Sequence, residues 1–166
     1  MTGSNLDRQQ AVTRAINSVA DVPGALLPIL HAVQDALGFV PPEAVDEVAT
    51  RLNLSRADVH GVLSFYHDFR ITPPKAHVVR LCRAEACQSM GGVALEALLA
   101  ERLGIADAHG AHGVNEAADT GNVTYEPAYC FGACACAPAA MIDGTLHGRL
   151  DVARLNALLD AMEQPV

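Results

Sequence analysis

The sequence has few basic residues and no long hydrophobic run. Its 166 residues include 11 Lys plus Arg against 19 Asp plus Glu, which gives a formal net charge of −8. A surplus of negative charge repels phosphate backbones and anionic membrane surfaces, so we expect no nucleic-acid partner. No stretch approaches the roughly 18 apolar residues that a membrane span requires, and the N-terminus lacks a basic segment followed by an apolar run. We therefore expect no membrane insertion and a cytoplasmic location.

The sequence also lacks the common motifs of catalytic and nucleotide-binding sites. It contains no glycine-rich phosphate loop after a strand pattern, no G-x-S-x-G elbow and no H-E-x-x-H helix. We therefore expect no substrate-transforming active site on this chain. A thiol–disulfide enzyme, in which a helix N-terminus activates Cys82 or Cys87, is a weak alternative because the usual C-x-x-C signature is absent.

Apolar residues recur at helical spacing in four groups between residues 4 and 70, which predicts four short helices. Gly38 stands where a C-cap glycine is expected, and Pro41–Pro42 suits a helix start. The segment Ser55–Asp58 matches a capping box. The groups are Val12, Ile16 and Val19; Leu26, Leu30, Val33 and Leu37; Val45, Val48 and Leu52; and Val59, Val62, Leu63 and Tyr66.

The pattern changes at Pro73–Pro74, because a double proline stops helix propagation. We therefore predict an α/β protein with two domains, a helical bundle over residues 1–72 and a small α/β domain over residues 73–166. The second domain is predicted to contain a strand at 77–81, a helix at 92–103, a strand at 122–126, a strand pair within 139–150 and a helix at 151–162.

Five cysteines lie in two groups. Cys82 and Cys87 form C-x4-C at the end of the first predicted strand, and a later loop holds Cys130, Cys134 and Cys136 as C-x3-C-x-C. In a reducing compartment, clustered thiols are metal ligands or redox groups more often than disulfides. Burial of cysteines as small hydrophobic residues does not produce such grouping, so we do not favour that interpretation.

The spacing of the cysteines favours a binuclear cluster over a single ion. A [2Fe–2S] cluster is held by four thiolates, and a C-x4-C pair occurs in one class, because the cluster is wider than one ion. Zinc is usually held by tighter pairs such as C-x2-C, although wider spacings occur, so a structural zinc module stays open as an alternative. A second zinc arrangement would join Cys82 and Cys87 to His109 and His112, but its H-x2-H spacing is below the usual range.

Glycines accompany both groups of cysteines. Gly132 and Gly91–Gly92 let backbone amides approach the sulfurs, and such hydrogen bonds favour a reduced cluster. We expect Cys134 to be the fourth ligand, because Gly132 lets the chain turn between Cys130 and Cys134. Cys136 lies at the entry to the next predicted strand, and we expect it to be a neighbouring thiol.

Three segments carry a resemblance to a known family. They are GVLSFYHDF at residues 61–69 followed by Pro73, VRLC at residues 79–82 followed by Cys87, and CFGAC at residues 130–134 followed by Ala137–Pro138. At these residues the sequence resembles the thioredoxin-like [2Fe–2S] family. That family includes the 24 kDa-type subunit of respiratory complex I, subunits of NAD-linked hydrogenases and the gamma subunit of NAD-dependent molybdenum formate dehydrogenase. The resemblance covers most of the chain.

The resemblance implies that Cys82, Cys87, Cys130 and Cys134 hold one [2Fe–2S] cluster in a thioredoxin-like domain behind an N-terminal helical domain. It also implies docking on a flavin- and NAD-binding subunit, with a large molybdenum and iron–sulfur subunit completing the enzyme. FMN, NAD and the molybdenum cofactor are then expected on those partner subunits only.

Two features indicate a subgroup. Residues Arg83–Ala86 stand where many relatives have small or hydroxyl residues, and Cys136 is an additional thiol; both look like the formate dehydrogenase gamma subunit. We therefore expect a non-catalytic electron-transfer subunit of an NAD-dependent formate dehydrogenase. The equivalent subunit of an NAD-linked hydrogenase or of NADH:quinone oxidoreductase is the alternative.

Overall fold

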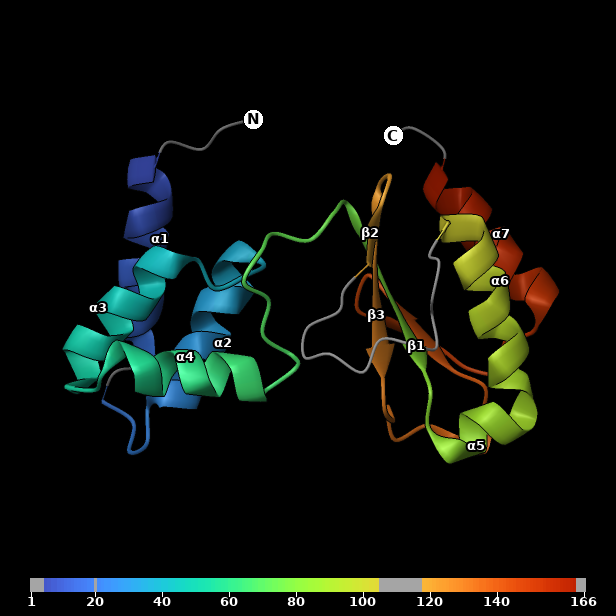
Figure 1. Ribbon diagram of the computed structural model, residues 1–166, viewed down its shortest axis with the longest axis horizontal. Helices are drawn as coiled ribbons and strands as arrows, with labels where there is room; N and C mark the ends of the chain where they lie inside the picture. The colour runs from blue at the N-terminus through green and yellow to red at the C-terminus, as the bar shows by residue number, and fades with distance from the viewer. Residues whose placement is uncertain (1–4, 20, 105–117, 164–166) are drawn as a thin grey trace. The chain divides into compact units, whose positions relative to one another are not determined.

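The chain divides into two units, Met1–Pro73 and Pro74–Val166. The structure is a computed structural model that describes residues 5–19, 21–104 and 118–163 (Figure 1). None of the helices in these ranges combines the length and the apolar character that a membrane crossing needs.

The first unit is helical, with α1 (Asn5–Val19), α2 (Leu26–Leu37), α3 (Pro42–Leu52) and α4 (Arg56–Phe65). This confirms the four predicted helices and most of their ends. Gly38 has φ 82° at the C-terminus of α2, and its N–H donates to the Gln34 carbonyl oxygen. Before α4, the Ser55 side chain accepts from the Asp58 N–H and the Asp58 carboxylate accepts from the Ser55 N–H, as a capping box requires.

A buried glutamine holds the segment that follows α4. The Gln34 side chain donates to the Asp68 carbonyl oxygen and accepts from the Arg70 N–H, both at 2.7 Å. Between these two residues, Phe69 is buried and its ring stacks against His31 with centroids 4.8 Å apart. The core of this unit contains eight of the predicted apolar positions, Val12, Ile16, Leu30, Val33, Val45, Val48, Val59 and Leu63, together with Ile29, Val40 and several alanines that were not predicted.

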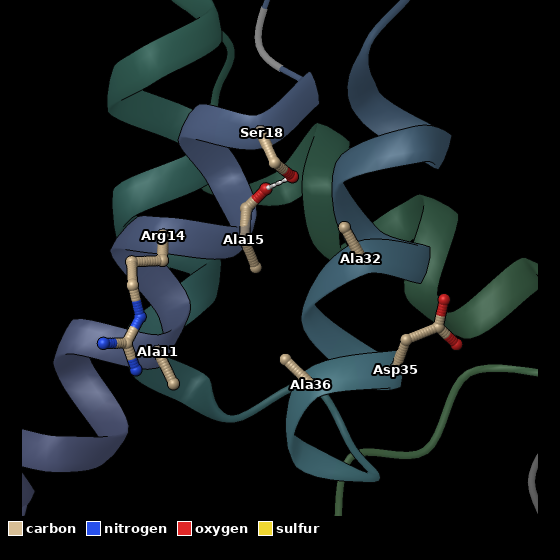
Figure 2. A pocket seen from close by; sticks show the side chains of 7 residues that line it. All are labelled: Ala11, Arg14, Ala15, Ser18, Ala32, Asp35 and Ala36. Atoms are coloured by element: carbon tan, nitrogen blue, oxygen red, sulfur yellow. Dashed lines mark hydrogen bonds between the residues drawn. The ribbon is translucent and has the colours of Figure 1, made fainter.

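An open groove between α1 and α2 is lined mainly by small side chains, with Arg14 and Asp35 as its charged residues (Figure 2). Its one hydroxyl, on Ser18, donates to the Ala15 carbonyl oxygen at 2.7 Å and is therefore satisfied within α1. The groove contains no cysteine or histidine, so we assign it no metal chemistry. Its lining residues are Ala11, Arg14, Ala15, Ser18, Ala32, Asp35 and Ala36.

The second unit is a mixed sheet with helices on one face, the thioredoxin-like arrangement that the resemblance implies (Figure 1). The strand order is β2-β3-β1-β4-β5, with β1 parallel to β3 and the other neighbours antiparallel. The elements are β1 (His77–Cys82), α5 (Glu85–Cys87), α6 (Val93–Leu103), β2 (Ala118–Thr120), β3 (Val123–Ala128), β4 (Ala140–Ile142), β5 (Thr145–His147) and α7 (Val152–Glu163). Helices α6 and α7 lie side by side on the sheet, and the core between them includes Val79, Leu81, Leu95, Leu99, Leu155 and Leu159.

The sequence pattern does not predict α5 or β2, because three residues are too few to show a period. It also does not show the wide turn at Gln88–Gly92 that joins α5 to α6, where Gly91 has φ 101°. The Ala137–Pro138 peptide bond before β4 is cis.

Candidate metal centre

The two groups of cysteines meet because β1 and β3 are parallel neighbours. Cys82 and Ala128 are register partners at the ends of these strands, so the chain leaves both strands at the same edge of the sheet. At the end of β1, the Cys82 N–H donates to the Ala139 carbonyl oxygen at 3.0 Å, and the next N–H, that of Arg83, donates to the Ala128 carbonyl oxygen at 2.7 Å. The loop that carries the later cysteines therefore starts and ends beside Cys82.

Cys82 and Cys87 form the buried pair. Each is 3% exposed, and the two pack in one small buried cluster with Ala137 and Ala139. Cys87 ends the single turn of α5, where its N–H donates to the Ala84 carbonyl oxygen at 2.9 Å. Directly after the turn, a Cβ on Gly92 would lie 2.6 Å from the Cys87 carbonyl oxygen. A residue without a side chain is therefore needed for the chain to pass Cys87 so closely.

Cys130 and Cys134 form the exposed pair, with their Sγ atoms 3.6 Å apart. The Gly132 N–H donates to Cys130 Sγ at 3.2 Å, which confirms that this glycine brings a backbone amide to a sulfur. Cys130 itself has φ 125°. A residue other than glycine rarely adopts such a backbone, which costs about 1–3 kcal/mol and is found most often at functional sites.

One thiol of each pair, Cys87 and Cys134, resists ionisation in the absence of a cation. Burial, followed by the hydrogen bond to Cys82, raises the pKa of Cys87. The hydrogen bond to Cys130, followed by the charge of Cys130, raises the pKa of Cys134. Phe131, which lies between Cys130 and Cys134 in the chain, packs against the buried cluster of Cys82 and Cys87, so the two pairs are neighbours. Because metal ligation requires thiolates, metal uptake at this site releases protons.

The chemistry of these donors fits a [2Fe–2S] cluster. In the described ranges, no three His, Cys, Asp or Glu side chains are grouped so that they can hold one metal ion. The thiols lie instead as two neighbouring pairs, and a binuclear cluster takes two protein ligands on each iron. His109 and His112, the histidines of the second zinc arrangement, lie outside the described residues.

Cys136 lies between the cysteine loop and the next strand. It shares a 3-10 turn with Cys134, and β4 begins at Ala140, after Ala137–Pro138. The half-buried Cys136 packs against Gly148, where an added Cβ would lie 2.8 Å from Cys136 Cβ. Its carbonyl oxygen accepts from the Arg149 N–H at 2.6 Å. These contacts hold Cys136 toward the β5–α7 connection.

Comparison with known proteins identifies the family. The sequence matches the family described as thioredoxin-like [2Fe–2S] ferredoxin over residues 12–163. The chain belongs to this family. In the described part of the chain, all five cysteines are free thiols.

The chain is similar to subunits of redox enzymes named in three comparisons. The E 2 subunit of NADH-quinone oxidoreductase from Rhizobium meliloti (strain 1021) is 31% identical over 153 residues, 92% of this chain and 87% of the relative. The HndA subunit of NADP-reducing hydrogenase from Solidesulfovibrio fructosivorans is 26% identical over 148 residues, 89% of this chain and 82% of the relative. The structure of NAD+-reducing [NiFe]-hydrogenase in the air-oxidized state is 28% identical with a TM-score of 0.64, over 84% of this chain but only 23% of that chain.

The sequence analysis did not predict an ion pair formed by the residue that follows Cys82. Arg83 Nε lies 2.9 Å from Glu96 Oε1, and both side chains are buried. In the sequence, Arg83 stands out only as a departure from many relatives. Glu96 does leave a signal, because an acidic residue three positions before Leu99 falls on the apolar side of α6.

Proposed function

We propose that this chain is an electron-transfer subunit that holds one [2Fe–2S] cluster on Cys82, Cys87, Cys130 and Cys134. The observation that carries the proposal is the meeting of two thiol pairs at one edge of the sheet, the first buried and the second exposed. Family membership supports the type of cluster.

The residues around the thiols suit electron transfer rather than acid–base chemistry. A bound [2Fe–2S] cluster would carry one electron at a time. The Gly132 N–H stabilises negative charge on the Cys130 sulfur, and Ala137, Ala139 and Phe131 give the buried pair apolar surroundings. The exposure of Cys130 places the site near the surface of its unit, where a redox partner can approach.

We propose further that the parent enzyme is an NAD-dependent formate dehydrogenase, which oxidises formate to CO2 and reduces NAD+. Residues Arg83–Ala86 and the additional thiol Cys136 support this subgroup. The partners are then a flavin- and NAD-binding subunit and a large molybdenum and iron–sulfur subunit. The names of the relatives favour a second candidate, the equivalent subunit of an NADH-quinone oxidoreductase or of an NAD-linked hydrogenase.

Purification of the native complex through a tag on this chain tests the parent enzyme. We expect molybdenum, FMN and formate-dependent NAD+ reduction in the complex, and neither formate nor NADH dehydrogenase activity in the isolated chain. Nickel with hydrogen-dependent activity, or a membrane complex with quinone reductase activity, would replace formate dehydrogenase by the corresponding alternative. Turnover of formate or NADH by the homogeneous isolated chain would contradict the assignment as a non-catalytic subunit.

A further inference from the structure

Arg83 connects the segments that carry the cysteines. It follows Cys82 directly, and its N–H donates to the carbonyl oxygen of Ala128 at the end of β3 (2.7 Å). Its own carbonyl oxygen accepts a hydrogen bond from Gln88 Nε2, one residue after Cys87 (2.6 Å). The Arg83 backbone is therefore held at a fixed place relative to the strand ends from which both groups of cysteines extend.

The Arg83 side chain is buried together with an opposite charge. Its Nε lies 2.9 Å from Glu96 Oε1, and the two side chains are 12% and 5% exposed. A charge in a surrounding of low dielectric acts on its neighbours more strongly than a charge in water. Tyr125 shows the reach of this pair: burial and the Glu96 carboxylate raise the pKa of Tyr125 to about 12, while the Arg83 guanidinium acts in the opposite direction.

We propose that Arg83 and Glu96 shift the reduction potential of the cluster in opposite directions. This inference rests on the proposed function, in which four cysteines hold a [2Fe–2S] cluster. Two ferric ions, two sulfides and four thiolates carry a net negative charge. One electron from an external reductant adds a further negative charge, without a bond being formed or broken.

The two side chains act on that added charge. The Arg83 guanidinium favours the more negative state and so raises the potential. The Glu96 carboxylate disfavours that state, and it also holds the guanidinium of Arg83, the residue that follows Cys82 in the chain. Both are positioning residues, because they act through charge and not as ligands.

The test is a dithionite titration of the full-length, cluster-loaded chain, followed by the paramagnetic signal, with iron measured in every variant. We expect Arg83→Gln to lower the potential and Glu96→Gln to raise it. Arg83→Lys keeps the positive charge and should restore most of the wild-type value. Loosened packing alone would move both glutamine variants in the same direction, since both would admit water to the site.

Asp160→Asn provides the matched control. Asp160 Oδ1 lies 2.7 Å from an Arg102 nitrogen, and Arg102 stands in the last turn of α6, beyond Glu96 in the same helix. The substitution removes the same charge as Glu96→Gln but from an exposed position, so we expect the potential to stay unchanged.

The outcomes separate this inference from the proposed function. Absence of iron from the wild-type chain would overturn the proposed function itself. Equal iron and equal potentials in the wild type and both glutamine variants, or shifts of the same sign in both, would overturn only the role of the ion pair.

A further variant decides the case in which the glutamine variants do not fold. The exchange Arg83→Glu/Glu96→Arg keeps an ion pair and places the negative charge beside Cys82, so we expect its potential to fall below the wild-type value. An unchanged potential in the exchanged pair, or loss of its iron as well, would show that the pair only maintains the fold and would overturn the proposal.

Discussion

Cys134 and Cys136 lie in one 3-10 turn, but their surroundings differ. The Cys134 sulfur is 3.6 Å from that of Cys130, whereas Cys136 packs against Gly148. We therefore predict that Cys134→Ala loses or badly distorts the cluster, while Cys136→Ala keeps it with at most a modest shift in potential. Iron content, visible absorption and the paramagnetic spectrum of the reduced state provide the measurement. The reverse outcome would move the fourth ligand to Cys136.

The glycine after the first cysteine pair provides a second prediction at the scale of one residue. Gly92→Ala forces its Cβ to within 2.6 Å of the Cys87 carbonyl oxygen, so the backbone of a proposed ligand must shift. Overpacking of this kind costs about 1–3 kcal/mol, and we expect a lower iron content per chain.

Gly61→Ala is the matched control for Gly92→Ala. Gly61 is exposed on α4 with no atom within 4 Å of an added Cβ, so the substitution should stabilise the helix by about 0.5–1 kcal/mol and leave iron unchanged. Equal iron in Gly92→Ala and Gly61→Ala would contradict the close passage of the chain at Cys87.

At the scale of the elements, the connection between α2 and the segment after α4 depends on one side chain. Gln34→Leu removes the 2.7 Å bonds to the Asp68 carbonyl oxygen and the Arg70 N–H. Loss of a partner for a buried polar group costs about 1–3 kcal/mol, so we expect a lower urea midpoint followed by far-UV circular dichroism. Gln10→Leu, at an exposed position of α1, is the control and should change the midpoint little. Equal midpoints in the two variants would show that the Gln34 bonds contribute nothing.

Helix ends that depend on neighbouring residues could be predicted from the sequence. A capping box such as Ser55–Asp58 and a C-cap glycine such as Gly38 depend only on neighbouring residues, and the structure confirms both. The turn Gln88–Gly92 was not predictable, because its shape depends on how closely the chain must pass Cys87. The sequence analysis also missed the 3-10 turn that joins Cys134 to Cys136, because three residues are too few to show a period.

At the scale of the whole molecule, the spacing of the cysteines shows that they form two groups. The spacing does not show how the fold brings the two groups to one edge of the sheet. That meeting depends on β1 and β3 being parallel neighbours, and strand order leaves no trace in a single sequence. The same limit concealed the Arg83–Glu96 pair, which forms only when α6 packs over the end of β1. The four proposed ligands therefore followed from the spacing of the cysteines and the family resemblance, while their surroundings required the fold.

The division into two units predicts that the second unit, residues 74–166, binds the cluster without the first. All five cysteines follow Pro73, and each unit has a hydrophobic core of its own. We expect a fragment of residues 74–166 to bind as much iron per chain as the full-length protein, and a fragment of residues 1–72 to bind none. A folded second fragment without iron would count against this separation of roles.

The central claim is that four cysteines of this chain hold one [2Fe–2S] cluster, and anaerobic purification of the full-length chain with metal and sulfide analysis tests it most directly. We predict roughly two irons and two acid-labile sulfides per chain, visible absorption, and a paramagnetic signal that appears only after reduction. A colourless protein with stoichiometric zinc and no iron would contradict the claim and favour a structural zinc module.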